Sequence, residues 1–372
     1  MKIKNKNYTV EILRFIFAID IALFHYRFFG FTDTDYFKNG YIGVEFFFIV
    51  SGYLMAENGI NKAGCEIYKE NIKFIVHKIK AIFIPCVTMQ VIGFILYHIT
   101  KADVTLKELI LDLLSFPYDL LLLRQWGFNF HWYIGVTWYI SAMLIAMFVR
   151  YPLLLKNKEK YTLYIAPIVT LLILGCFSYR DGKISDTSAY WGIIYKSTLR
   201  AFAIINLGVM IYTFTKWLNR FTFTSMAKRI LGVIEIISLS IPLFYAFYTT
   251  DLNLEFESLF FMSLGIMISF LNITIIDDLA GKMYKLFGKL GKLSMLIFIS
   301  HCPILYYVLP LVKNYANGFM LLVIYISLVV IMSVLLLVIN NAVNKNINKI
   351  ILDKGNNVST EGNGLSNGSC KY

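Results

Sequence analysis

Residues 10–29 read VEILRFIFAIDIALFHYRFF, an apolar stretch that contains Arg14 and His25. The stretch has the roughly 20 residues that cross a bilayer as a helix. The two side chains are eleven positions apart, and eleven steps of about 100° end about 20° past three full turns, so they share one helix face. Ionisable residues at membrane depth are costly and commonly functional. The stretch therefore predicts a membrane-spanning helix with a polar stripe.

The composition of the whole chain indicates the same environment. Hydrophobic residues make up 58% of the 372 positions, and only 16% are charged, against about a quarter in soluble domains. The core of an ordinary soluble domain could not hide so much apolar side chain. We predict an all-α fold, a polytopic transmembrane helical bundle.

The apolar residues lie in separated blocks, most of which are long enough to span a membrane. There are ten, at residues 10–29, 40–55, 81–99, 134–155, 161–178, 191–214, 230–249, 257–276, 293–312 and 319–341. A further stretch, residues 104–123, is apolar but broken by charges and Pro117. We predict about ten spans, with 104–123 as an interfacial or re-entrant segment.

The basic residues give an independent check on this topology. With a cytoplasmic N-terminus, 24 of the 35 Lys and Arg fall in inner segments, eight in outer segments and three within spans. This alternation favours ten spans with both termini cytoplasmic, in the inner (cytoplasmic) membrane. The net charge of +12 then reflects topology and attraction to membrane lipids, not a nucleic-acid partner.

The chain divides into two predicted regions. Residues 1–343 form the transmembrane domain, and residues 344–372, which are polar and end rich in Asn, Gly and Ser, are predicted to be a disordered cytoplasmic tail. The five cysteines show no metal-binding or redox spacing, and no HExxH motif occurs. The sequence therefore predicts no metal site.

The second block carries the run GVEFFFIVSGYL, residues 43–54. Its Glu45 is expected near the outer end of the first span, where a carboxylate could orient His25 for general base catalysis. Structural alternatives stay open for the polar residues of both blocks. His25 fits a solvated interfacial histidine, Arg14 fits an arginine that snorkels to the inner headgroups, and Ser51 fits close helix packing.

At this point the chain resembles the acyltransferase 3 family of integral membrane acyltransferases. Four features carry the resemblance: the spacing of Arg14 and His25, the run from Gly43 to Leu54, the segment TWYISAML from Thr137, and LGKLSMLIFISH ending at His301. They occur in the family's order over most of the chain.

One part departs from the family pattern. Before the proline of the third span the family often has R-x-x-R, proposed to hold the phosphates of coenzyme A. Here Lys78 stands for one arginine and Ala81 takes the place of the other, ahead of Pro85. Lys80 could supply the charge, without the bidentate fork of arginine. The alternative is that this segment is only a positively charged inner loop.

The resemblance implies a mechanism. Acyl-coenzyme A, most commonly acetyl-CoA, would dock at Lys78, Lys80 and Arg14, as a donor substrate and not a permanently bound cofactor. His25, held by Glu45, would deprotonate a sugar hydroxyl that attacks the thioester directly or through a transient acyl-enzyme. Arg14 would be the third catalytic residue, and it would bind the donor or stabilise negative charge. The remaining candidates are expected to line the substrate cavity: Ser51, Trp138, Tyr139, Ser294 and His301. The sequence assigns no role to Ser294 and His301.

The acceptor class follows from family and topology alone. It would be a bacterial surface glycan or a lipid-linked oligosaccharide precursor, and the reaction an O-acetylation. Two other classes stay open: a transporter or flippase for a lipid-linked sugar or an acyl group, and a membrane scaffold with a decayed site.

Overall fold

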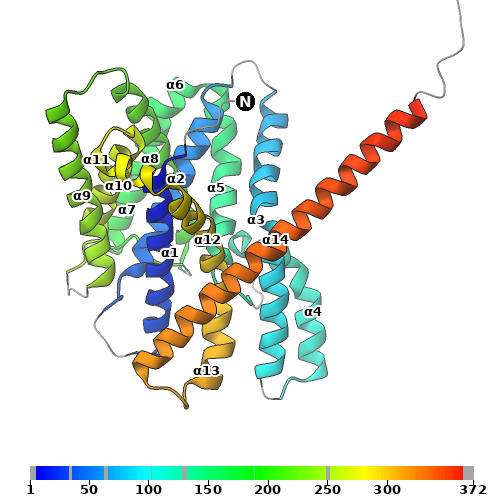
Figure 1. Cartoon of the computed structure of the whole chain (residues 1–372). Helices are drawn as coiled ribbons and strands as arrows, with labels where there is room; N and C mark the ends of the chain where they lie inside the picture. Colours follow the sequence, from blue (N-terminus) through cyan, green and yellow to red (C-terminus); the bar gives the residue numbers. More distant parts are fainter. Residues whose placement is uncertain are drawn as a thin grey trace, which may run out of the picture.

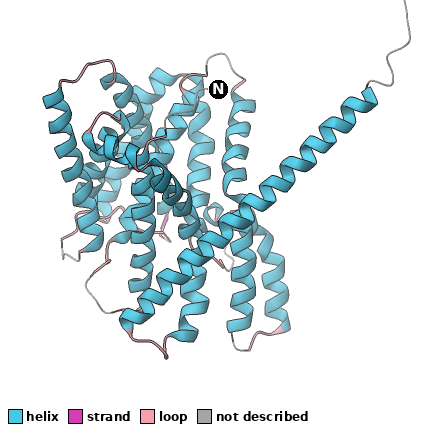
Figure 2. Ribbon diagram, in the orientation of Figure 1, coloured by secondary structure: helices cyan, strands magenta, loops and turns pink. Residues whose placement is uncertain are grey.

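A computed structural model describes residues 6–32, 36–62, 66–101, 103–127, 132–187, 189–248 and 252–362, with backbone only from residue 347. The described chain is almost entirely helical, with a single short strand pair (Figure 2). This agrees with the predicted all-α class. The long helices lie side by side, and α14 crosses the front of the bundle diagonally (Figure 1).

The elements follow one another in this order: α1 (Tyr8–Phe28), η1 (Gly40–Ile42), α2 (Gly43–Gly59), α3 (Ile67–Thr100), α4 (Leu106–Leu120), η2 (Arg124–Trp126), α5 (Thr137–Lys156), α6 (Lys158–Lys160), η3 (Tyr161–Ile165), α7 (Ala166–Arg180), β1 (Tyr190–Trp191), β2 (Ile194–Tyr195), α8 (Lys196–Leu218), α9 (Ser225–Phe247), α10 (Glu255–Leu271), α11 (Ile275–Lys282), α12 (Tyr284–Pro303), η4 (Ile304–Val308), α13 (Leu309–Val312) and α14 (Gly318–Gly362). Strands β1 and β2 pair antiparallel. The elements η3 and η4 are single π-helical turns, and η4 directly follows Pro303.

The helices are those of a polytopic membrane protein. Among the described residues, eight helical segments are long and apolar enough to cross a membrane, or nine if the bent pair α10 and α11 counts as one span. Helix α1 is not among them, because its 21 residues include Glu11, Arg14, Asp20 and Arg27. The prediction of ten spans adds α1 to this set. That number and the cytoplasmic termini stay predictions.

Helix α1 is fixed at its start and along its length. The side chain of Asn7 caps it by accepting from the amide of Val10 at 2.9 Å, and Asn7 Nδ2 also donates to the carbonyl of Ser269 at 2.6 Å. Along its length α1 packs against α12 and α2. These neighbours bring the second and fourth sequence motifs toward the first.

Helices α2 and α8 approach each other at two glycines. A Cβ at Gly52 would collide with the carbonyl of Ile205, and one at Gly208 would collide with the carbonyl of Ile49. Only residues without a side chain allow the backbones this close, which is the packing role that small residues have between membrane helices. The approach places the first turn of α2 beside α8.

Helix α4 lies in the segment that was predicted to be interfacial or re-entrant. It has 15 residues and starts at a capping box formed by Thr105 and Glu108. It lies beside the C-terminal half of α3 (Figure 1). At about 1.5 Å per residue it is too short to cross a bilayer. Four of its leucines are exposed, as expected for a surface in lipid: Leu106, Leu111, Leu113 and Leu114.

Helix α14 continues beyond the predicted domain boundary. Its backbone is helical from Gly318 to Gly362, so it passes position 344, where the tail was predicted to begin. Residues 363–372 lie outside the described residues. The predicted disordered tail stays a prediction.

Candidate active site

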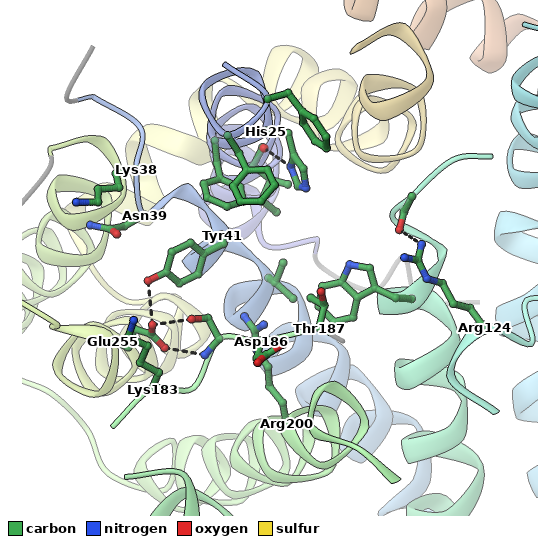
Figure 3. A pocket seen from close by; sticks show the side chains of 18 of the residues that line it. His25, Lys38, Asn39, Tyr41, Arg124, Lys183, Asp186, Thr187, Arg200 and Glu255 are labelled. Atoms are coloured by element: carbon green, nitrogen blue, oxygen red, sulfur yellow. Dashed lines mark hydrogen bonds between the residues drawn. The ribbon is translucent and has the colours of Figure 1, made fainter. Parts of the chain in front are cut away.

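A cavity of about 640 Å³ opens at the end of α1 that carries His25. We call it the His25 cavity. Figure 3 shows that its labelled residues come from α1, α8, α10 and the segments that join the helices. Aromatic side chains form much of its wall: Phe24, Phe28, Phe29, Tyr41, Trp138 and Tyr306. Charged side chains complete it: Lys38, Arg124, Lys183, Asp186, Arg200 and Glu255.

The imidazole of His25 is held by its own helix. Nδ1 lies 2.9 Å from the carbonyl oxygen of Ile21 (Figure 3). Because a carbonyl only accepts, Nδ1 carries the hydrogen, and the lone pair is on Nε2. The ring also packs edge-on to Phe24, with centroids 5.0 Å apart, and lies 4.9 Å from the ring of His301. His25 is therefore oriented with a basic nitrogen available.

Glu45 binds a partner that the sequence analysis did not name. It is fully buried, and its Oε1 accepts from Nε of Arg200 at 2.6 Å. The Arg200 guanidinium also lies 5.7 Å from the ring of Trp138. This corrects the expectation that Glu45 orients His25: the backbone of Ile21 does so, and Glu45 neutralises an arginine in the cavity wall.

Glu255 ties the segment that follows α7 to the cavity wall. Its carboxylate accepts from the amides of Ile184 at 2.6 Å and Ser185 at 2.7 Å, and from the hydroxyls of Ser185 at 2.7 Å and Tyr41 at 2.9 Å (Figure 3). On another side of the cavity Arg124 donates to the carbonyl of Gly135. Burial lowers the pKa of Arg124 from its usual value. These contacts fix the segments that line the cavity.

A second cavity of about 640 Å³ lies toward the other end of α1, among α1, α3, α12 and α14. We call it the Arg14 cavity. Four cations line it with one carboxylate: Lys6, Arg14, Lys289, Lys292 and Glu11. Glu11 Oε1 lies 3.3 Å from Arg14, and Oε2 lies 2.8 Å from Lys6. The excess of cations suits an anionic ligand.

The segment in the place of the family's R-x-x-R lines this cavity, but with other residues than those expected to bind the donor. Ala81, Ile82 and Pro85 line it, whereas Lys78 and Lys80 do not. The Lys78 ammonium lies over the ring of Phe74, 5.5 Å from its centroid. The structure thus brings Arg14 together with Lys289 and Lys292, and the role predicted for Lys78 and Lys80 stays a prediction.

The other predicted residues lie between or beside the two cavities. Trp138 lines the His25 cavity. Ser51 and Tyr139 line neither of the two cavities; both hydroxyls contact Sδ of Met143, at 3.4 and 3.6 Å. Ser294 is buried and donates to the carbonyl of Gly291 at 2.7 Å. His301 is buried next to His25.

Several residues of the two cavities escaped the sequence analysis. Arg200 carried a signal, since an arginine within an apolar block needs a buried partner, and Glu45 was the matching carboxylate. In the sequence analysis, Lys289 and Lys292 were interpreted as ordinary basic residues of an inner segment. Glu255 sits just outside an apolar block. Arg200 and Glu255 share one feature, which is that each binds a residue far away in the chain.

The chain was compared with models of known protein families, with curated proteins and with solved structures. The model of a family described as an acyltransferase domain matches residues 7–338, nearly the full length, which confirms the resemblance drawn from the four motifs. No curated protein and no solved structure matched the chain. The match covers the whole lining of the His25 cavity, most of the lining of the Arg14 cavity, and the helix that connects them. The chain therefore belongs to the acyltransferase 3 family and is a membrane acyltransferase.

Proposed function

We propose that this protein transfers an acyl group, most commonly acetyl, from acyl-CoA to a sugar hydroxyl of a bacterial surface polysaccharide or its lipid-linked precursor. One observation carries the proposal. Helix α1 places Arg14 in a cation-lined cavity and His25 in an aromatic cavity, roughly 16 Å apart along its axis at 1.5 Å per residue. A donor and an acceptor could each reach the same helix from opposite ends.

The Arg14 cavity is the proposed donor site. Coenzyme A carries several phosphate charges, and Lys6, Arg14, Lys289 and Lys292 offer cations to them. Arginine binds phosphate through paired N–H groups, whereas lysine acts as a point charge. The apolar side chains of the same cavity, among them Ile82 and Leu296, would accompany the pantetheine arm toward His25.

The His25 cavity is the proposed acceptor site. Its aromatic walls, with a few convergent polar groups, are typical of pockets that bind small organic groups. Trp138 and Tyr306 offer flat faces to a sugar ring, and Lys38 and Lys183 could pair with phosphate or carboxylate groups of a glycan precursor. This arrangement favours an acceptor that is partly apolar and partly anionic.

In the proposed reaction His25 acts as the general base. Its Nε2 takes the proton from the sugar hydroxyl while the oxygen attacks the thioester carbonyl. The carbon–sulfur bond then breaks, the ester is formed, and the proton passes from His25 to the departing coenzyme A thiolate. The backbone contact between Nδ1 and Ile21 keeps the imidazole in the tautomer that this step needs.

The location in the cell follows from the proposed topology. With α1 starting in the cytoplasm, the Arg14 cavity would face cytoplasmic acyl-CoA, and the His25 cavity would face the outer side of the inner (cytoplasmic) membrane. The protein would then pass an acyl group made inside to a glycan displayed outside.

The test uses full-length protein purified in detergent, radiolabelled acetyl-CoA and glycan extracted from a strain that lacks the gene. Wild type is expected to label the glycan, and His25→Ala to lose the transfer while it still folds. His98→Gln is the matched control, since His98 contacts Asp112 at 3.4 Å and lines neither cavity. Undiminished labelling by His25→Ala would overturn the mechanism.

A further inference from the structure

Three side chains of the types that commonly bind metals meet at the wall of the His25 cavity. They are His25 of α1 and the neighbours His301 and Cys302 of α12, and one ligand atom of each lies within 4.8 Å of the other two. Cys302 Sγ is 3.2 Å from His301 Nε2. His301 and Cys302 are fully buried, whereas His25 lines the cavity (Figure 3). The group is thus enclosed on the protein side and reachable from the cavity.

Both histidines present their lone pairs to this group. Nδ1 of His25 donates to the carbonyl of Ile21 at 2.9 Å, and Nδ1 of His301 donates to the carbonyl of Ile297 at 3.2 Å. With Nδ1 carrying the hydrogen, Nε2 of each ring carries the lone pair, and that of His301 accepts from the thiol of Cys302 at 3.2 Å. Histidines that bind metals are held in the same way, by a hydrogen bond from the other ring nitrogen. Two oriented lone pairs and a thiol therefore converge.

We propose that His25, His301 and Cys302 bind a divalent transition-metal ion of the zinc class, and that the bound ion inhibits acyl transfer. Imidazole and thiolate ligands suit Zn²⁺, whereas Mg²⁺ and Ca²⁺ prefer oxygen ligands. Bonds form from the metal to both Nε2 atoms and to Sγ. The S–H bond of Cys302 breaks, and its proton leaves to water through the cavity.

The geometry needs one small adjustment. Tetrahedral zinc with ordinary bond lengths sets its ligand atoms about 3.3–3.6 Å apart. The contact between His301 and Cys302, at 3.2 Å, already has nearly this spacing. His25 closes the remaining distance from the cavity wall, where its side chain is only partly buried. A fourth coordination position then faces the cavity and takes water.

The inhibitory half of the proposal rests on the proposed function. The lone pair of His25 that would accept the hydroxyl proton is the one that binds the metal, so both cannot occur together. Zinc at this site would stop transfer, and a chelator would restore it.

The first experiment measures binding alone. Full-length protein is purified, treated with chelator and titrated with Zn²⁺ against a chromophoric chelator, and Co²⁺ is used as the spectroscopic probe. We expect one Zn²⁺ per chain and a thiolate-to-cobalt charge-transfer band. Cys302→Ser should weaken Zn²⁺ binding at least tenfold and abolish the band. Cys86→Ser is the matched control, because Cys86 is equally buried but lies on α3.

Two results would overturn the site. One is a chain that binds no Zn²⁺, and the other is a Cys302→Ser variant that binds it as wild type does or keeps the cobalt band. Cys302→Ser changes one atom, so the variant is expected to fold. His301→Gln gives a second, independent variant with the same expected loss.

The second experiment measures transfer against Zn²⁺ concentration, each variant relative to its own metal-free rate. Wild type and Cys86→Ser should be inhibited, and Cys302→Ser should need at least tenfold more Zn²⁺. Binding without inhibition would contradict the inhibitory role and the assignment of His25 as the base. Absence of transfer in metal-free protein would contradict the proposed function and leave the binding result standing.

Discussion

Arg200 of α8 donates from Nε to Oε1 of Glu45 on α2 at 2.6 Å, and both side chains are buried. The pair joins the two helices that carry the glycine contact between Gly52 and Gly208. Because Arg200 also lines the His25 cavity, the same ion pair links the packing of the bundle to the shape of the proposed acceptor site.

Removing one charge of this pair should destabilise the folded protein. Arg200→Met or Glu45→Met leaves the other charge buried without its partner, and each is expected to lower the free energy of unfolding by about 3–5 kcal/mol. The double variant should lose much less free energy of unfolding than the sum of the two single losses, because no unpaired charge remains. Unfolding in detergent, followed by circular dichroism, measures all three. Additive losses would contradict a direct pairing.

The glycine contact should tolerate no side chain. Gly52→Ala is expected to lower the free energy of unfolding by about 1–3 kcal/mol, because a Cβ there meets the backbone of Ile205. Gly175→Ala on α7 is the matched control: a Cβ there meets nothing within 4 Å, and a helical Gly→Ala change should stabilise by roughly 0.5–1 kcal/mol. Equal effects at both positions would argue against the close approach.

The Arg14 cavity should govern the affinity for the donor. Arg14→Ala and Lys289→Ala are each expected to raise KM for acyl-CoA about tenfold, the loss of one charged hydrogen bond. KM for the acceptor should stay unchanged. Lys216→Ala serves as the control, since Lys216 is an exposed cation over the ring of Tyr212 and lines neither cavity.

The same assay locates the phosphates. If Lys78→Ala and Lys80→Ala raise KM for acyl-CoA more than Lys289→Ala does, the donor binds the segment before Pro85 rather than the Arg14 cavity. That outcome would favour the site predicted from the family motif over the one that the cavity indicates.

Glu255 should hold the loop at residues 183–187 in place. Glu255→Gln keeps the size of the side chain but removes acceptor capacity for the amides of Ile184 and Ser185. Hydrogen exchange at these two amides is expected to accelerate at least tenfold, and KM for the acceptor to rise. Glu257→Gln, an exposed neighbour on the same helix, should leave exchange as in wild type. Unchanged protection in Glu255→Gln would contradict the role of Glu255.

Much of the fold was readable from local patterns. The apolar blocks predicted the long helices, because block length and composition are properties of a contiguous stretch. The broken block at residues 104–123 predicted an interfacial or re-entrant segment, and the structure has the 15-residue helix α4 there. The spacing of Arg14 and His25 placed both on one face of α1, since helical periodicity depends on local geometry alone.

The predictions that were wrong or incomplete concern partners. Glu45 was expected to orient His25, but its partner Arg200 lies 155 positions away on α8. Cys302 showed no metal spacing in the sequence, yet it meets His25 because α12 packs along α1. A buried charge signals that a partner is required, but its identity depends on which helices become neighbours.

The sequence by itself determined that this is a helical membrane protein of the acyltransferase 3 family, with a polar stripe on its first helix. Only the tertiary structure decided how that stripe is used. It set Arg14 among Lys6, Lys289 and Lys292, and it set His25 against His301 and Cys302. The physical reason is that the composition and periodicity of apolar residues are properties of a contiguous stretch, and they are enough to predict a helix. Which charged groups and lone pairs interact depends on distances that are set only when the helices pack.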